Sequence, residues 1–236
     1  MIDLKELIQK TGVSLDDKQL SQLNTYYELL TETNKVMNLT AITEYDEVAL
    51  KHFADSLAIV NAYEFPTASH IIDVGTGAGF PGIVLKIAFP ELSITLLDSL
   101  NKRVNFLNLV IDKLSLENIT AIHGRAEDIA RNSSYREQYD VCLSRAVANL
   151  STLSEYCIPF VKKDGFFISY KAGDCEKEIS DAGHAIGILG GKTEKIVDYT
   201  LPDSDIERKF VLIRKVKPTS NKYPRKSGTP AKEPLK

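Results

Sequence analysis

Hydrophobic residues are spaced in two different ways on either side of residue 66. Before it, apolar residues recur three or four positions apart, as from Leu20 to Leu30, which is the spacing of an amphipathic helix. The pattern predicts one helix from an N-cap at Ser14 to about residue 34, and another over residues 46–62. We therefore expect residues 1–65 to form a helical N-terminal extension.

From residue 66 to 216, short apolar runs alternate with segments of helical length. The runs predict strands at 70–74, 93–98, 119–123, 139–144 and 165–170, and the segments between them predict helices at 81–88, 101–114, 126–131, 149–160 and 174–185. Two more runs, 195–201 and 209–216, have no helix between them and should pair antiparallel at one side of the sheet. Such alternation is typical of an α/β fold, here a doubly wound, mostly parallel sheet of seven strands.

Length and composition fit one domain over residues 66–216 with that extension. The chain has 236 residues, of which 43% are hydrophobic, enough to build a core. No run approaches ~18 apolar residues, and the N-terminus is charged where a signal peptide would be apolar, so we expect a cytoplasmic protein without a membrane span. The three cysteines lack C-x-x-C spacing, which predicts neither disulfides nor a metal site.

Charge is distributed unevenly, with a basic end to the chain. From Arg208 onward there are ten basic residues and one acidic residue, although the whole chain has a net charge of −3. The tail, 217–236, is rich in Pro, Gly, Ser and Lys and is expected to be irregular. Its Lys222, Arg225 and Lys226 are candidates to bind RNA phosphates, and the alternative is a tail that only aids solubility.

A glycine-rich turn between the first predicted strand and the next helix is the main candidate for a ligand site. Gly75, Gly77 and Gly79 have the spacing G-x-G-x-G, whereas a dinucleotide site expects G-x-G-x-x-G. Asp73, two residues before the first glycine, is awkward for a diphosphate. It suits a ligand with an ammonium group, such as the methionine part of S-adenosylmethionine.

Acidic residues also follow the next two predicted strands. Asp98 ends the second strand, where a carboxylate can accept hydrogen bonds from both ribose hydroxyls, and Glu127 follows the third. Carboxyl ends of parallel strands share one edge of a sheet, so these residues and the glycine turn should line one crevice. Each acid, Asp73 included, could instead be a turn residue or a helix cap.

The absence of two motifs narrows the kinds of molecule that could accept a methyl group from S-adenosylmethionine. After the fourth strand the chain reads Ser-Arg-Ala-Val over 144–147, without the Asn/Asp-Pro-Pro-Tyr/Phe turn of exocyclic amine methylation. Cys142 lies within a strand, so we expect it to be packed and not to be the nucleophile of carbon-5 methylation. A ring nitrogen such as guanine N7 carries no proton and needs only alignment with the methyl donor. Arg145 is a candidate to clamp the cofactor carboxylate or to contact RNA, and Lys171 is a weaker candidate for a phosphate.

Taken together, these motifs resemble the bacterial ribosomal small-subunit methyltransferase G family, also called glucose-inhibited division protein B. The resemblance covers essentially the whole chain. It rests on segments 38–42, 52–57, 73–82, 97–103, 125–127 and 144–146, and on the Tyr-Pro-Arg-Lys tail. The Phe-Pro-Gly after the glycine turn and the Leu-Asp-Ser-Leu-x-Lys-Arg run are more specific than the glycines.

The resemblance implies a class I methyltransferase fold and N7 methylation of one guanine in the 530 loop of 16S ribosomal RNA. It places contacts to S-adenosylmethionine on Gly75, Phe80, Ala126, Glu127 and Arg145, and makes Asp98 the ribose-binding acid. Asn38 and His52 would face the RNA, in roles that do not follow from the sequence. The substrate would be naked 16S ribosomal RNA, a 30S subunit or an assembly intermediate, and we expect a monomer.

Two functions of other classes compete with this one. A non-catalytic RNA-binding module with a vestigial cofactor fold is disfavoured by the intact glycine turn and the three strand-end acids. An NAD-dependent oxidoreductase is disfavoured by the glycine spacing and by the basic tail.

Overall fold

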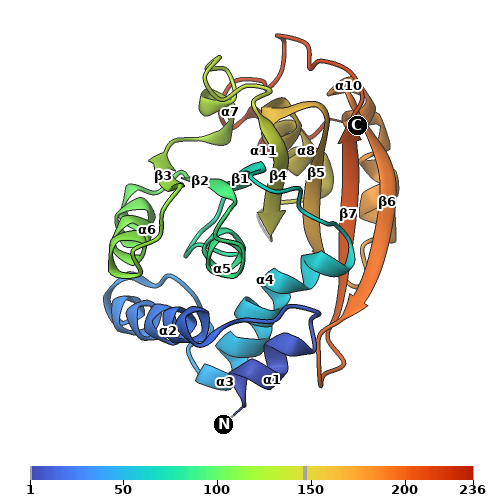
Figure 1. The fold of residues 1–236 in the computed structure, drawn as a ribbon. Coiled ribbons are helices and arrows are strands. Elements are labelled where there is room, and N and C mark those ends of the chain that lie inside the picture. Colours follow the sequence, from blue (N-terminus) through green and yellow to red (C-terminus); the bar gives the residue numbers. More distant parts are fainter. Residues whose placement is uncertain (1, 146–147, 236) are drawn as a thin grey trace.

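The apolar runs after residue 66 form one seven-stranded sheet in a computed structural model, which describes residues 2–145 and 148–235 (Figure 1). Its strands are β1 (His70–Val74), β2 (Ser93–Asp98), β3 (Ile119–His123), β4 (Tyr139–Arg145), β5 (Val161–Ala172), β6 (Gly191–Thr200) and β7 (Glu207–Lys215). They are ordered β3-β2-β1-β4-β5-β7-β6. Strands β1 to β5 run parallel, and β7 pairs antiparallel with both β5 and β6. The predicted fold class and the antiparallel pair at one side are confirmed.

Helices connect the parallel strands and cover both faces of the sheet. They are α5 (Gly82–Ala88), α6 (Asn101–Lys113), α7 (Ala126–Ile129), α8 (Leu150–Cys157), the 3₁₀ turn η3 (Ile158–Phe160), α9 (Glu176–Asp181) and α10 (Gly183–Ile188). One more short helix, α11 (Thr229–Lys232), follows the last strand in the C-terminal tail. The single helix predicted over 174–185 is therefore wrong, because the chain breaks at Ala182. Gly183 follows the break, and glycine is a poor helix former.

Strand β5 begins at Val161, four residues before the predicted start. The register between β4 and β5 shifts between Tyr139 and Val141, so the polar residues 162–164 continue the strand across an irregularity. Gly165 is needed there, since a Cβ would lie 2.5 Å from the Asp140 carbonyl oxygen. Hydrophobic alternation alone does not mark such a bulge.

The N-terminal extension is helical, as predicted, but its elements start at different places. A short helix, α1 (Leu4–Gln9), was not predicted because six residues are too few to display a period. The main helix, α2 (Asp17–Met37), starts after Asp16, which forms a reciprocal capping box with Gln19, so Ser14 is not its cap. It ends at Asn38, whose left-handed backbone (φ 50°) stops the helix.

The second predicted helix is a continuous run of four segments of three helical types. It comprises α3 (Tyr45–Val48), the π-helical η1 (Ala49–Ala54), α4 (Asp55–Leu57) and the 3₁₀ turn η2 (Ala58–Asn61). A π-helical segment widens the turn and often marks a functional position. Here it carries His52, one of the predicted RNA contacts.

The core consists of two hydrophobic clusters, one on each face of the sheet. The first joins the N-terminal helices to α5, α6 and one sheet face, and the second joins α8, η3 and α10 to the other. Figure 1 shows the N-terminal helices gathered at one end of the molecule beside α5. Residues 2–65 thus share a core with the α/β domain. Within the described ranges, no helix is long and apolar enough to cross a membrane.

Candidate functional site

The loop between β1 and α5 uses left-handed backbone at all three of its glycines. Gly75, Gly77 and Gly79 have φ angles of 72°, 63° and 105°, which other residues rarely adopt. A Cβ on Gly79 would lie 2.5 Å from the Ile83 side chain, whereas a Cβ on Gly77 would meet nothing within 4 Å. One side of the loop is therefore packed, and the side at Gly77 is open to a ligand.

Asp73 is fully buried beneath this loop. Its Oδ2 accepts hydrogen bonds from the Thr76 hydroxyl (2.6 Å) and from the Gly82 amide (2.9 Å), so it ties β1 to the start of α5. Its Oδ1 accepts no hydrogen bond from any residue that the structure describes. Burial raises the pKa of this carboxyl to about 6, and the hydrogen bonds oppose the rise. The lone buried oxygen is an acceptor that a ligand cation would satisfy.

Asp98, at the end of β2, organises the neighbouring loop and still faces a cavity. Its Oδ2 accepts from the Gly77 amide (3.0 Å) and lies 3.4 Å from Arg103 Nη1, while its Oδ1 accepts from the Leu100 amide (2.9 Å). A carboxylate offers about four acceptor positions, so it retains capacity for a ribose hydroxyl.

Two adjacent cavities share Gly75 and Ser99 in their linings, where the strand ends predicted a single crevice. Asp98 lines the first and Glu127 the second, whereas Asp73 and Gly79 line neither. The first, of about 380 Å³, is lined by Leu39, Thr40, His52, Gly75, Thr76, Gly77, Ala78, Phe80, Asp98, Ser99, Arg103 and Arg145. The second, of about 360 Å³, is lined by Val74, Gly75, Leu97, Ser99, Gly124, Arg125, Ala126, Glu127, Ala148, Tyr156 and Ala231. The second has more apolar walls, which suit a flat base, and the first has the charges that a methionine moiety requires.

His52, Phe80 and Arg145 form one group in the first cavity. The His52 and Phe80 rings stack with centroids 4.5 Å apart, and the Arg145 guanidinium lies 5.2 Å from the Phe80 centroid. Burial and the Arg145 charge lower the pKa of His52 to about 4, so its ring is neutral near pH 7. The ring Nε2 lies 3.0 Å from the Thr40 hydroxyl. His52 is thus placed in the site by its neighbours, although its segment alone did not indicate this.

Asp55 is a buried carboxylate that sequence analysis did not single out. Its Oδ2 accepts from Arg145 Nη1 and its Oδ1 from Arg208 Nε, both at 2.6 Å. One carboxylate therefore binds two guanidinium groups, and the three side chains together carry a net positive charge. The only earlier signal was its place in the motif 52–57 of the resemblance.

A third cavity, of about 340 Å³, adjoins the first through His52 and Arg145. Its lining includes the cationic side chains of Lys51, Arg145, Lys171 and Arg208, with Asp55 as the one acid. Lys171 Nζ also donates to the Ala148 carbonyl and pairs with Glu178 on α9, so its charge is partly compensated. The arrangement suits a phosphate or a nucleotide next to the cofactor crevice.

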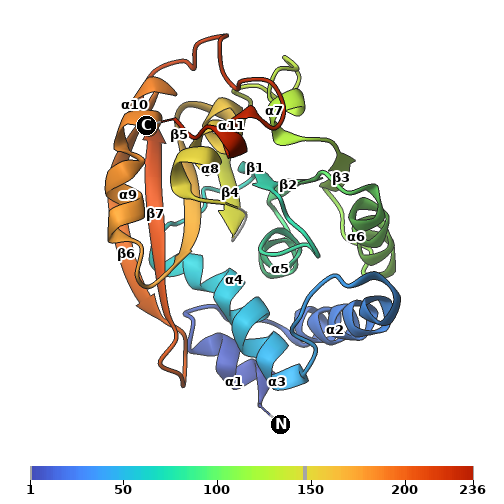
Figure 2. The same ribbon diagram turned by 180° about the vertical axis from the view of Figure 1, so that it is seen from behind.

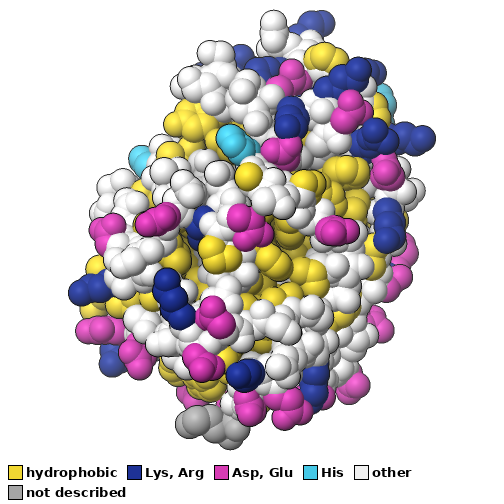
Figure 3. Space-filling view, viewed as in Figure 1, with side chains coloured by type: hydrophobic (Ala, Val, Ile, Leu, Met, Phe, Trp, Pro, Cys, Tyr) yellow, Lys and Arg dark blue, Asp and Glu magenta, His cyan; other side chains and the backbone are white. Residues whose placement is uncertain are grey.

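The remaining predicted RNA contacts have different environments. Asn38, Lys222 and Lys226 are exposed, and Asn38 precedes Leu39 and Thr40 at the first cavity. Arg225 instead pairs with Glu155, whose side chain is fully buried. On the face of the molecule seen in Figure 3, Lys and Arg side chains gather at the end where the tail leaves β7.

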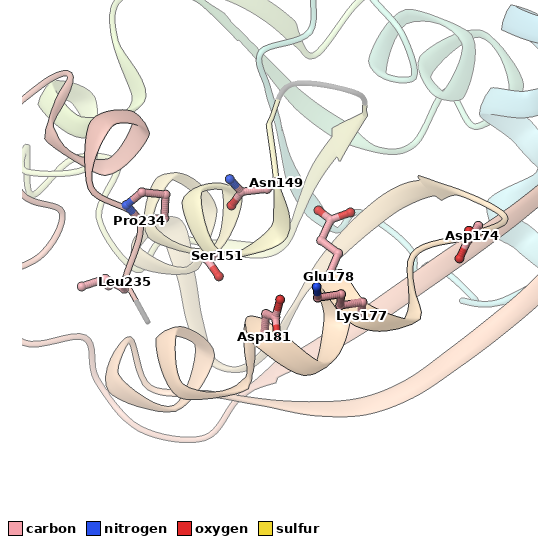
Figure 4. A pocket seen from close by; sticks show the side chains of 8 residues that line it. All are labelled: Asn149, Ser151, Asp174, Lys177, Glu178, Asp181, Pro234 and Leu235. Carbon is pink, nitrogen blue, oxygen red and sulfur yellow. The ribbon is translucent and has the colours of Figure 1, made fainter.

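A separate cavity of about 780 Å³ lies between α8, α9 and the end of the tail (Figure 4). It is lined by Asn149, Ser151, Asp174, Lys177, Glu178, Asp181, Pro234 and Leu235. Three acids against one lysine disfavour a phosphate ligand. In the parts of the chain that the structure describes, no group of three His, Cys, Asp or Glu side chains is placed to hold a metal ion.

The cysteines are all buried. Cys142 is packed within β4, as expected, and its burial raises the pKa of its thiol. Ala146 and Val147, part of the segment where an amine-methylation turn would stand, lie outside the described residues.

This sheet order, with the glycine loop after β1 and an acid at the end of β2, defines the class I S-adenosylmethionine-dependent methyltransferases. Solved structures share the fold at low identity. TYW2 of M. jannaschii in complex with AdoMet has a TM-score of 0.52 and 13% identity, with 66% of this chain and 73% of that one covered. TrmN from Thermus thermophilus has a TM-score of 0.53 and 12% identity, with 68% and 48% covered.

The chain belongs to the rRNA small subunit methyltransferase G family, whose model matches residues 19–208. A protein named Ribosomal RNA small subunit methyltransferase G from Lachnoclostridium phytofermentans is 53% identical over 228 residues, covering 97% of this chain and 94% of that protein. A protein of the same name from Alkaliphilus metalliredigens is 51% identical, covering 99% and 98%. The predicted family is confirmed.

Proposed function

We propose that this protein transfers the methyl group of S-adenosylmethionine to N7 of one guanine in the 530 loop of 16S ribosomal RNA. The observation that carries the proposal is the adjacency of two chemically different spaces. The glycine-loop crevice shares His52 and Arg145 with a neighbouring cavity that is lined by four cationic side chains. Membership in the family supports ribosomal RNA as the acceptor.

The residues of the crevice fit S-adenosylmethionine. The free Oδ1 of Asp73 is a candidate partner for its ammonium group, and Asp98 for its ribose. Ala126 and Glu127 border the space for the adenine, and Gly77 leaves room for close approach of a ligand. When bound, the cofactor supplies an electrophilic methyl group on a sulfonium.

Guanine N7 demands little acid–base chemistry from the protein. Its lone pair is free and carries no proton, so the work of the site is to align N7 with the methyl group and to exclude water. His52 is neutral and its ring is stacked on Phe80, which gives a flat surface beside the donor space. We assign no catalytic base, and Arg145, which borders both spaces, is the candidate to orient donor and acceptor.

Binding of RNA is supported by charge. Arg208 and Lys171 line the cavity beside the crevice, and Lys222 and Lys226 are exposed on the tail. Contacts of this kind release counterions and should make binding salt-dependent. We further propose that the enzyme acts as a monomer in the cytoplasm, on a 30S subunit or an assembly intermediate.

Transfer of label from tritiated S-adenosylmethionine tests the proposal. The acceptors are naked 16S ribosomal RNA and 30S subunits from a strain that lacks the modification. We expect label in 16S RNA, with faster transfer to the 30S particle. If neither acceptor is labelled while S-adenosylhomocysteine still binds, the proposal fails.

A further inference from the structure

The C-terminal tail contains one short helix, α11, is otherwise irregular, and is packed along the segment 127–137. Contacts run in antiparallel order: the Thr219 amide donates to Glu137, Arg136 donates to the carbonyls of Thr219, Ser220 and Tyr223, and Arg131 donates to the Pro224 carbonyl. Figure 2 shows α11, near the end of the tail, next to α8 and α7. A basic tail whose only role was to bind RNA would not require these contacts with the rest of the protein.

Arg225 holds the tail against helix α8. Its backbone amide donates to Glu155 Oε1 (2.6 Å), its Nε lies 3.0 Å from Oε1, and its Nη2 lies 2.7 Å from Oε2. Glu155 lies on α8 with its side chain fully buried. Removing one partner of a buried ion pair leaves an uncompensated charge, so this pair fixes where the tail lies. Tyr223 and Leu235 also pack against the second core cluster.

The anchored segment then reaches the cofactor crevice. Ser227 donates to Asp128 Oδ1 (2.7 Å), and the Gly228 amide donates to Glu127 Oε1 (2.8 Å). Three residues later, Ala231 lines the second cavity together with Ala126 and Tyr156. The other walls of that cavity come from the ends of β1, β2 and β3 and from α8.

We propose that residues 225–231 form a wall of the adenosine part of the cofactor site, and that Arg225 is a positioning residue for that wall. The inference rests on the proposed function, since it takes the ligand of this cavity to be S-adenosylmethionine. It reassigns Arg225 from RNA binding to cofactor binding, while the adjacent Lys226 remains an RNA contact. The Gly228 amide also fixes the orientation of the Glu127 carboxylate.

The most direct test fills the cavity from the tail side. Ala231→Phe places a bulky ring at the lining position, and Lys232→Phe places the same ring one residue along the same short helix, where the residue is exposed and does not line the cavity. Calorimetric titration of the full-length protein with S-adenosylhomocysteine should show affinity at least about tenfold weaker for Ala231→Phe and unchanged within about twofold for Lys232→Phe. Thermal unfolding without ligand should be unchanged in both, because both positions are exposed.

A second pair of variants separates Arg225 from its neighbour. Arg225→Ala should weaken S-adenosylhomocysteine and raise the KM for S-adenosylmethionine, while kcat and the salt dependence of RNA binding stay as in the wild type. Lys226→Ala should leave the KM for S-adenosylmethionine unchanged and lower the salt slope of RNA binding by about one. Arg225→Ala leaves the buried Glu155 without its partner, so stability should fall as well. A purely structural role for Arg225 would lower the apparent kcat through a smaller folded fraction and leave the KM for S-adenosylmethionine at the wild-type value.

The outcomes are distinguishable from failure of the proposed function. If the wild-type protein does not bind S-adenosylhomocysteine, the proposed function fails. If the wild type binds and Ala231→Phe binds equally well, the tail is not a wall of the site and the inference is wrong. A lower RNA salt slope in Arg225→Ala, with cofactor affinity intact, would return Arg225 to the RNA contacts.

Discussion

The Tyr26 hydroxyl donates a hydrogen bond to the Ala78 carbonyl oxygen at 2.5 Å, which joins the N-terminal helix α2 to the middle of the glycine loop. Tyr26 is fully buried, and its ring packs against Phe53 and Phe80. A Cβ on Gly79 would lie 2.8 Å from the same hydroxyl, so the glycine is also required by this contact. The N-terminal extension therefore shapes the cofactor loop directly.

Replacing Tyr26 by Phe should loosen the loop without opening the core. The ring remains, but the Ala78 carbonyl loses its donor, so we expect a loss of about 1 kcal/mol in the free energy of unfolding. Binding of S-adenosylhomocysteine should weaken severalfold. Tyr27→Phe is the matched control, because the Tyr27 hydroxyl bonds to the Thr43 carbonyl away from the loop. Equal cofactor affinity in the two variants would contradict this role of Tyr26.

Affinity for S-adenosylhomocysteine should depend on the ionisation of Asp73. The pKa of Asp73 is raised to about 6, and its ionised form is the one that attracts an ammonium group. Affinity should rise as the pH increases through about 6 and level off above it. Asp73→Asn keeps the acceptor for Thr76 and Gly82 but removes the charge, so its affinity should be weaker and nearly independent of pH. A wild-type affinity that is flat from about pH 5 to 7.5 would contradict a contact between Asp73 and the ammonium group.

His52 and Asp73 should affect the pH dependence of stability in opposite directions. The folded-state pKa of His52 is lowered to about 4 from 6.5, so the folded protein binds fewer protons there and stability rises with pH through that range. The folded-state pKa of Asp73 is raised to about 6 from 3.8, so stability falls as pH rises over nearly the same range.

Urea unfolding of single variants between about pH 4 and 6.5 separates these two contributions. Relative to the wild type, His52→Gln should lose stability as the pH rises, because only Asp73 remains of the pair. Asp73→Asn should gain stability as the pH rises, because only His52 remains. Identical pH profiles for both variants would contradict these two assignments.

Arg208 should contribute to RNA binding and not to cofactor binding. It lines the cationic cavity but not the cofactor crevice, and Asp55 keeps Arg145 as a partner when Arg208 is removed. Arg208→Ala should raise the KM for RNA and lower the salt slope of RNA binding by about one, with S-adenosylhomocysteine affinity unchanged. Arg214→Ala is the control on the same strand, since Arg214 pairs with the exposed Asp164. An RNA affinity equal in both variants would place the RNA elsewhere.

The sequence was sufficient to predict the positions of candidate site residues that follow strand ends. The glycine loop, Asp73 and Asp98 follow strands whose apolar runs are unmistakable, and parallel strands bring their carboxyl ends together. The N-cap of helix α2 was harder to predict. Ser14 and Asp16 are both good N-cap residues, and only the reciprocal hydrogen bonds with Gln19 decide for Asp16.

Contacts between distant segments could not be predicted from spacing. Asp55 bonds to Arg145 and Arg208, which lie 90 and 153 residues away. Charge suggested that Arg225 and Lys226 are alike, but a buried acid 70 residues away binds one of them and leaves its neighbour exposed. Net charge describes a segment as a whole, whereas tertiary packing decides which of its charges face solvent.

Mapping the methylated base tests the central claim most directly. Unmodified 30S subunits are incubated with the protein and S-adenosylmethionine, and the 16S RNA is cleaved with borohydride and aniline, which detects N7-methylguanine. Primer extension should then show one new stop, in the 530 loop, that is absent when the cofactor or the protein is omitted. A stop at another guanine, or label in the RNA without any cleavage by aniline, would contradict the account.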